Sequence, residues 1–171
     1  MTSQPLDRAL VEEAAKKSGL LWVRGAEASA ARAVWHVWHE GAVCLVGDGP
    51  GEQPLPGLAD GGAAEVTVRS KDKGGRLVSF PATVTELAAG TPEWAAAVAE
   101  LKGKRLNAPD AERMPDRWAR ECRVLRLVPA GPVAALPDGD LAERPVATPA
   151  TTRRPVPAAL PKLLARRRKG R

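Results

Sequence analysis

Four alternate residues near the start of the chain combine a cation, an imidazole and an indole with one aliphatic side chain: Arg32, Val34, His36 and Trp38. Because side chains alternate faces along a β-strand, these four would share one strand face. Such a set is unusual for a plain core. We interpret it as the lining of a pocket for a flat, anionic ligand, with Arg32 making charge-assisted hydrogen bonds to a phosphate.

The aromatic and imidazole groups of this strand also have ordinary interpretations. His36 could donate a proton or ligate a metal or haem iron, but a strand histidine is more often half-buried with its hydrogen bonds satisfied. His36 and His39 would point to opposite faces, so the sequence does not predict a shared metal. Trp38, like Trp35, could stack on a flat ring or pack in the core.

A second group of polar residues follows a later apolar segment: Arg69, Ser70 and Lys71. The ordinary interpretation is a solvated hairpin end. The sharper hypothesis is an anion site, because Arg69 and Lys71 would share a face. The Gly/Pro-rich loop at residues 48–62 could add backbone amides, although it matches neither a P-loop nor a dinucleotide-binding motif.

Other reaction classes are poorly supported by the sequence. The chain has only two histidines, both in one strand, and no acid placed to help them, so hydrolytic triads and zinc sites are not expected. The two cysteines, Cys44 and Cys122, lie in apolar contexts and are expected to be free, buried thiols.

Apolar periodicity and turn residues predict a mainly β domain with flanking helices. A tight Glu40-Gly41 turn joins two strands, and Thr91-Pro92 marks a helix start. The expected elements are a helix at 5–18, strands at 20–24, 32–39, 42–47, 65–69, 77–87 and 120–128, and a helix at 91–105. Closing these antiparallel strands into a small barrel would remove exposed sheet edges.

The charge of the chain is divided unevenly. The net charge is +6, but residues 151–171 contain eight basic residues and no acid, so the first 150 residues carry −2. We expect a folded domain at residues 1–135 and a Pro/Ala-rich, basic, disordered tail at 136–171. The tail could bind nucleic acid or an acidic surface through Arg166, Arg167, Arg168 and Lys169, or simply be solvated.

Targeting signals are not evident in the sequence. No run of about 18 apolar residues is present, so no membrane span is expected. The first residues lack the apolar centre of a secretory signal, which favours a cytoplasmic protein.

Three segments resemble the flavin-binding split β-barrel family, which includes the pyridoxamine 5′-phosphate oxidases and their actinobacterial relatives. They are Arg32-Ala33-Val34, Arg76–Val84 and Val124–Pro129. The resemblance spans roughly residues 5–134. It implies a six-stranded antiparallel split barrel, FMN or a deazaflavin as cofactor, oxidoreductase chemistry, and a homodimer with the flavin in the groove between subunits. The arginine of the first motif, here Arg32, would contact the flavin phosphate.

The chain also departs from this family. Where the family carries a Ser/Arg/Lys cluster after its third strand, residues 47–53 hold two acids and no base, and Leu77 stands where glutamine is usual. The alternatives are a non-catalytic barrel that has lost its cofactor or binds haem, and a nucleic-acid-associated protein acting through its tail. The candidate cofactor-binding residues are Arg32, His36, Trp38, Arg69, Ser70 and Lys71.

Overall fold

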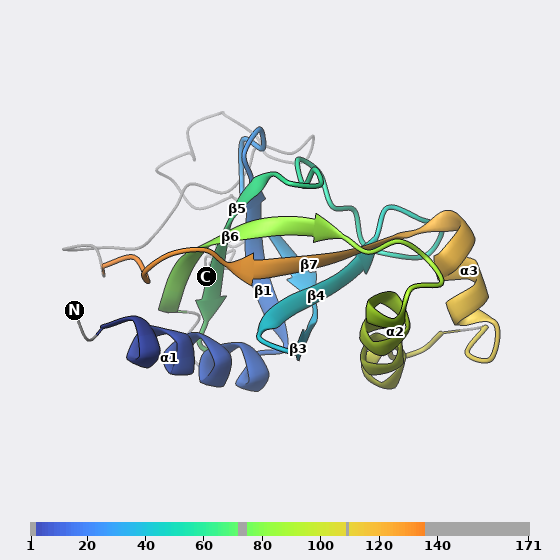
Figure 1. Ribbon diagram of the computed structural model, residues 1–171, viewed down its shortest axis with the longest axis horizontal. Coiled ribbons are helices and arrows are strands. Elements are labelled where there is room, and N and C mark those ends of the chain that lie inside the picture. The colour runs from blue at the N-terminus through green and yellow to red at the C-terminus, as the bar shows by residue number, and fades with distance from the viewer. Residues whose placement is uncertain (1–2, 72–74, 109, 136–171) are drawn as a thin grey trace, which may run out of the picture. The chain divides into compact units, whose positions relative to one another are not determined.

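The computed structural model describes residues 3–71, 75–108 and 110–135, which form an antiparallel sheet with three helices (Figure 1). The elements are α1 (Ser3–Lys17), β1 (Leu20–Gly25), β2 (Arg32–Trp35), β3 (Val37–His39), β4 (Ala42–Gly47), β5 (Ala63–Arg69), β6 (Arg76–Glu86), α2 (Pro92–Lys104), α3 (Met114–Glu121) and β7 (Arg123–Pro129). The strands lie in the order β2-β1-β5-β6-β7-β4-β3. Residues 136–171, including the predicted basic tail, lie outside the described part.

The two ends of this strand order are joined by a single residue. The sequence predicts one strand over residues 32–39, but the chain divides at His36 into β2, which pairs with β1, and β3, which pairs with β4. Because β2 and β3 are consecutive in the chain, the sheet curls into a ring that closes through His36. The fold is therefore a split barrel as expected, with seven strands rather than six.

A side chain fills the gap that this division opens between β2 and β4. The Gln53 carboxamide oxygen accepts from the Trp35 N–H at 2.8 Å, and its Nε2 donates to the Trp35 carbonyl at 2.9 Å. Nε2 also lies 3.2 Å from the Val46 carbonyl oxygen. The amide thus replaces the hydrogen bonds that a neighbouring strand would make, since buried backbone groups require partners.

Two apolar clusters lie on opposite sides of the sheet. The cluster inside the barrel includes Val34, and the half-buried Trp38 packs against it. The cluster outside includes Val37, with Trp35 packed against it beneath α2 and α3. The predicted alternation along residues 34–38 is therefore confirmed. The α1 helix contributes Val11 to the inner cluster and lies across one end of the barrel (Figure 1).

One helix was not foreseen in the sequence. The sequence predicts no helix after residue 105 and a strand from residue 120, yet α3 spans Met114–Glu121 with Pro115 in its first turn, and β7 begins only at Arg123. Proline is tolerated there because the first N–H groups of a helix have no intrahelical partner. Burial of Met114 and Trp118 against the outer cluster stabilises this short helix.

The local signals of turn and cap are confirmed. Glu40 and Gly41 have φ values of 46° and 77°, as a two-residue hairpin turn requires. The Thr91 side chain accepts from the Trp94 N–H at the start of α2. Among the described residues, no helix is both long and apolar enough to cross a bilayer.

Candidate functional site

Buried charges hold the loop at residues 48–62 in place. The Glu52 side chain has no exposed surface and accepts hydrogen bonds from Arg105 Nε at 3.1 Å and Arg117 Nη2 at 3.0 Å. The Trp118 indole N–H donates to the same carboxylate at 3.0 Å. Both guanidinium groups also donate to backbone carbonyls of the loop. The loop is thus tied to the ends of α2 and α3.

The other acid of this loop is also engaged. Asp48 accepts from the Leu55 N–H at 2.7 Å and pairs with Arg123 at 3.2 Å. Leu55 and Leu58 are buried in the inner cluster. A phosphate at this loop would have to displace a carboxylate from an arginine. The loop is therefore a packed part of the domain, and its geometry does not support the hypothesis that it cradles an anion.

His36 is placed where it serves the fold. Its side chain is buried, and Nε2 donates to the Ala15 carbonyl of α1 at 2.9 Å, a carbonyl near the helix C-terminus. Nδ1 has no partner among the described residues. Burial lowers the pKa of the imidazole to about 4, so the ring is neutral near pH 7. The favoured interpretation of a half-buried, satisfied strand histidine agrees only in part: Nε2 is bonded within the fold, but the ring is fully buried, lies between β2 and β3, and leaves Nδ1 without a described partner.

The structure separates Arg32 from the other predicted site residues. Arg32 stands opposite Val23 in the ladder, so it shares the inward row of side chains, at the exposed end of β2. It makes no hydrogen bond or ion pair with any residue that the structure describes. Trp38 lies against the inner cluster beyond His36. Arg32, His36 and Trp38 therefore share a face, as predicted, without lining one open pocket.

Arg69, Ser70 and Lys71 lie together at the end of β5, on a different part of the molecule. The Arg69 guanidinium carbon lies 4.9 Å from the centre of the Trp22 ring. The Ser70 N–H donates to the Gly75 carbonyl at 2.8 Å, and the Lys71 side chain is exposed. No carboxylate among the described residues pairs with Arg69. This half of the predicted set is a cluster of hydrogen-bond donors beside an aromatic ring.

The Trp22 ring belongs to a surface that we call the β1–β5 outer face: Leu20, Trp22 and Arg24 of β1, and Glu65, Thr67 and Arg69 of β5. Leu21 and Val23 alternate with the β1 members and are buried inside the barrel. Trp22 is half-buried and stands between Ala33 and Thr67 in the ladders. The main helix contacts are with β3, β4, β6 and β7, and on β1 Leu20 and Arg24 are exposed while Trp22 is half-buried.

Trp22 is the residue that sequence reasoning missed. The signal that could have found it is the alternation in Leu20–Arg24, where Trp22 shares a face with the charged Arg24 and lies opposite Leu21 and Val23.

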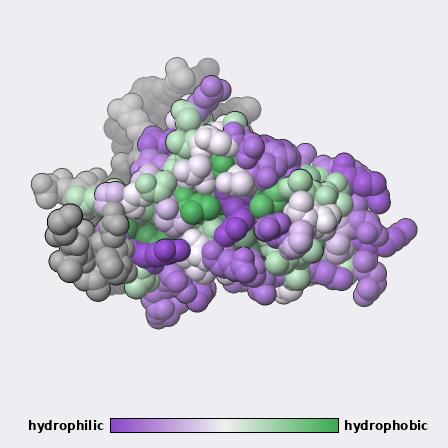
Figure 2. Space-filling view, viewed as in Figure 1, coloured by the Kyte–Doolittle hydropathy of each residue, from purple (hydrophilic) through white to green (hydrophobic). Residues whose placement is uncertain are grey.

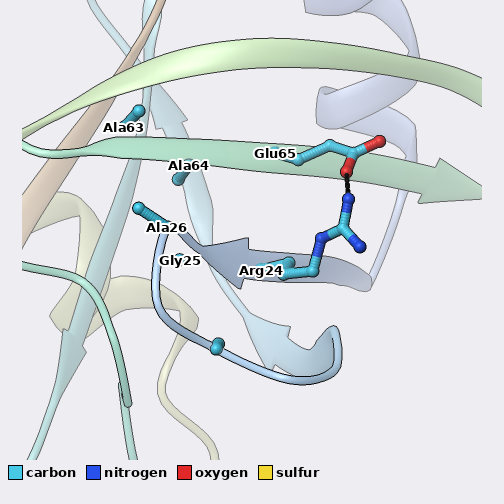
Figure 3. Close-up of a pocket in the computed structure, with 7 residues that line it drawn as sticks. Arg24, Gly25, Ala26, Ala63, Ala64 and Glu65 are labelled. Carbon is cyan, nitrogen blue, oxygen red and sulfur yellow. Dashed lines mark hydrogen bonds and ion pairs between the residues drawn. The ribbon is translucent and has the colours of Figure 1, made fainter.

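Two surface cavities are lined by other described residues. One has a volume of about 370 Å³ and lies at the Gly25 end of the β1–β5 outer face (Figure 3). The other has a volume of about 600 Å³ and lies between α1 and the end of β7, with Arg8, Val11 and Val128 among its lining residues. Arg32 lines neither of them.

The cysteines and the acidic residues restrict the chemistry that the described residues can perform. Cys44 is buried and Cys122 is half-buried, and both are free. Burial raises the pKa of the Cys44 thiol to about 11, which makes it a poor nucleophile at neutral pH. The described residues contain no cluster of His, Cys, Asp and Glu able to hold a metal ion. On the face in Figure 2, charged side chains interrupt the apolar surface.

The sequence matches no protein-family model and no curated protein. Among solved structures, the haem storage protein HutZ from Vibrio cholerae has a TM-score of 0.49 at 12% identity, covering 78% of this chain and 94% of its own. A conserved hypothetical protein from Mycobacterium tuberculosis has a TM-score of 0.49 at 14% identity, covering 84% and 94%. An FAD- and haem-binding protein from Mycobacterium smegmatis has a TM-score of 0.46 at 14% identity, covering 96% and 95%.

These likenesses are distant, and the site assignment rests on the residues described above. The strand order and the closure of the ring at His36 make the chain a split β-barrel protein.

Proposed function

We propose that this protein binds a flat, anionic redox cofactor of the flavin or deazaflavin class at the Arg69 end of the β1–β5 outer face. The observation that carries the proposal is the Arg69 guanidinium over the accessible Trp22 ring, 4.9 Å from its centre. A bound flavin would supply the hydride chemistry, whereas the protein would supply orientation and charge.

The residues of this region suit the two ends of such a molecule. An indole face stacks on flat conjugated rings, and Ala33 beside Trp22 leaves space above the sheet. Arg69 and Lys71 provide a guanidinium and an ammonium group for a phosphate, and Ser70 lies between them in the chain. We expect the ring system against Trp22 and the phosphate at the end of β5.

The haem alternative fits the residues less well. His36 was considered as an iron ligand, but its Nε2 is already bonded to the Ala15 carbonyl. Its side chain has 1% exposure, so an iron atom could reach it only if the domain opened. This geometry favours the flavin class over haem.

A second copy of the chain would complete the proposed site. Leu20 and Leu77 are 46% and 51% exposed, and they lie on the strands that flank Arg69. Burying such apolar side chains at a subunit contact is favourable. We propose a homodimer in which this face meets its copy, and light scattering after size-exclusion chromatography should give twice the mass of the chain.

The test is a titration of FMN with the full-length protein, followed by flavin fluorescence, which stacking on an indole quenches. We expect Arg69→Gln to weaken FMN binding by about tenfold or more, because a charged hydrogen bond contributes roughly 1.5–3 kcal/mol. Arg120→Gln, on the exposed surface of α3, is the matched control and should leave binding unchanged. Unquenched FMN with the wild-type protein, or equal affinity in Arg69→Gln, would contradict the proposal.

A second candidate function rests on the charge of residues 151–171. Eight basic residues without an acid would attract a polyanion such as RNA or DNA. These residues lie outside the described part, so the proposal depends on composition alone. Binding should weaken steeply with salt and be lost when residues 151–171 are removed. Affinity that survives truncation would overturn it.

A further inference from the structure

The cavity of about 370 Å³ lies at the end of β1 and β5 farthest from Arg69. Its wall combines five small residues with one ion pair, and it is lined by Arg24, Gly25, Ala26, Ala28, Ala63, Ala64 and Glu65. Figure 3 shows Arg24 and Glu65 joined at one side, with the small residues at the other. The cavity thus has an apolar part and a polar part.

The backbone fixes the inner end of this cavity. A Cβ atom added to Gly25 would lie 2.1 Å from the Gly57 carbonyl oxygen, which is far too close. Glycine is therefore required at position 25, where the loop carrying Gly57 packs directly on β1. This close contact holds the end of β1, so the cavity is a built feature of the domain.

The polar part presents a donor beside an acceptor. Arg24 and Glu65 are direct partners in the β1–β5 ladder, and their side chains form an ion pair. The two side chains are 50% and 44% exposed, and among the described residues they bond only to each other. A guanidinium has five N–H donors and a carboxylate has two oxygens, so this pair keeps spare groups of both kinds.

A neutral group that both accepts and donates hydrogen bonds matches the Arg24–Glu65 ion pair. A primary carboxamide can accept from Arg24 through its oxygen and donate to Glu65 through its N–H. A carboxylate would be repelled by Glu65, and an ammonium group would be repelled by Arg24. The volume lies at the small end of the range for ligand pockets, and the alanines suit a compact apolar body.

From this geometry we propose that the cavity binds a primary carboxamide carried on a small, flat body, such as benzamide or nicotinamide. Arg24 lies two residues after Trp22 on the same face, roughly 7 Å along the strand. A ring held here would therefore lie beside a cofactor stacked on Trp22. This last step rests on the proposed function, whereas the carboxamide site itself does not.

The test uses the full-length protein and NMR titrations of its backbone amides. We expect benzamide to shift the signals of Gly25, Ala26, Ala63 and Ala64. Benzoate and acetophenone have the same ring but lack the neutral donor and acceptor together, and they should bind at least about fivefold more weakly. Absence of shifts with benzamide, or equal binding of benzoate, would overturn the proposal.

Substitutions in the cavity test whether the Arg24–Glu65 ion pair recognises the carboxamide. Arg24→Met should lose benzamide binding, whereas the exchange of both charges, Arg24→Glu with Glu65→Arg, should retain it because donor and acceptor stay adjacent. Ala63→Leu fills the cavity from an exposed position and should also abolish binding, with the circular dichroism spectrum unchanged. Benzamide affinity that is unaltered in both Arg24→Met and Ala63→Leu would refute the site.

The same samples distinguish this inference from the proposed function. Ala63→Leu should leave FMN binding unchanged, and Arg69→Gln should leave benzamide binding unchanged. FMN that fails to bind while benzamide binds would remove the cofactor proposal alone. The reverse result would remove the carboxamide site alone.

Discussion

Two arginine–tryptophan pairs in this protein have opposite roles. Arg117 and Trp118, on α3, both donate to the buried Glu52 carboxylate. Arg69 and Trp22 contact each other on the accessible β1–β5 outer face, where no described carboxylate pairs with the arginine. The same residue types thus stabilise the fold in one place and are available to a ligand in the other. What covers them decides between the two roles.

The energetic expectations for the two regions differ accordingly. A carboxylate removed from water requires partners, and loss of such a partner leaves a buried charge uncompensated. A guanidinium over an exposed ring contributes little, because water competes for both groups. Substitutions in the two regions should therefore separate stability from binding.

The largest effect is expected at Glu52. Glu52→Gln should lower the free energy of unfolding by about 3–5 kcal/mol, because Arg105 and Arg117 would lose their shared carboxylate. Urea denaturation measures this loss. Glu13→Gln is the control, since that residue pairs with Lys17 on the exposed side of α1 and should leave the free energy of unfolding nearly unchanged. A loss below about 1 kcal/mol in Glu52→Gln would show that the buried network stabilises the fold no more than the exposed contact between Arg69 and Trp22.

The next effect depends on pH. Burial lowers the pKa of His36 to about 4, below the ordinary value of 6.5. Above pH 6.5 the ring is neutral in both states and contributes nothing. Between pH 6.5 and 4 the unfolded chain takes up a proton at this residue and the folded chain does not. The free energy of unfolding therefore decreases as the pH is lowered through this range, by roughly 3 kcal/mol in total.

The His36→Gln variant isolates this term from other titrating groups. Its amide can still donate to the Ala15 carbonyl, but it does not titrate. Urea midpoints at pH 7 and pH 5 should therefore differ less in the variant than in the wild-type protein. An identical difference would show that His36 titrates normally in the folded state.

A smaller effect is expected at the start of α2. Thr91→Ala removes the side-chain oxygen that accepts from the Trp94 N–H at 3.2 Å, and the unfolding free energy should fall by about 1 kcal/mol. Thr91→Ser keeps the acceptor and should restore most of the stability. Equal losses in the two variants would show that the cap contributes nothing.

The smallest change in stability is expected at Arg69. Arg69→Gln removes the contact with Trp22 and should alter the unfolding free energy by less than about 1 kcal/mol, while its effect on FMN binding is large. Arg117→Gln is the matched change in the buried network and should cost more. A stability loss at Arg69 that equals the loss at Arg117 would erase the contrast between the two regions.

Much of the local structure follows from short patterns. The Glu40-Gly41 turn, the Thr91 cap and the alternation of Val34 and Trp38 are each fixed by a few adjacent residues. The proposed site holds part of the predicted set: Arg69, Ser70 and Lys71 lie together, but apart from Arg32. The alternation along residues 32–38 predicted that Arg32 shares a face with Val34, and the ladder with Val23 shows that this face is the inward one.

The sequence alone determined the antiparallel strands and the alternation of side chains along them, because these depend on neighbours in the chain. Only the tertiary structure decided that the strand divides at His36, that α3 forms, and that Glu52 meets Arg105 and Arg117 across more than fifty residues. Burial and charge pairing depend on which distant segments pack together. They therefore separate the arginines that pair with buried carboxylates from Arg69, which pairs with no described carboxylate.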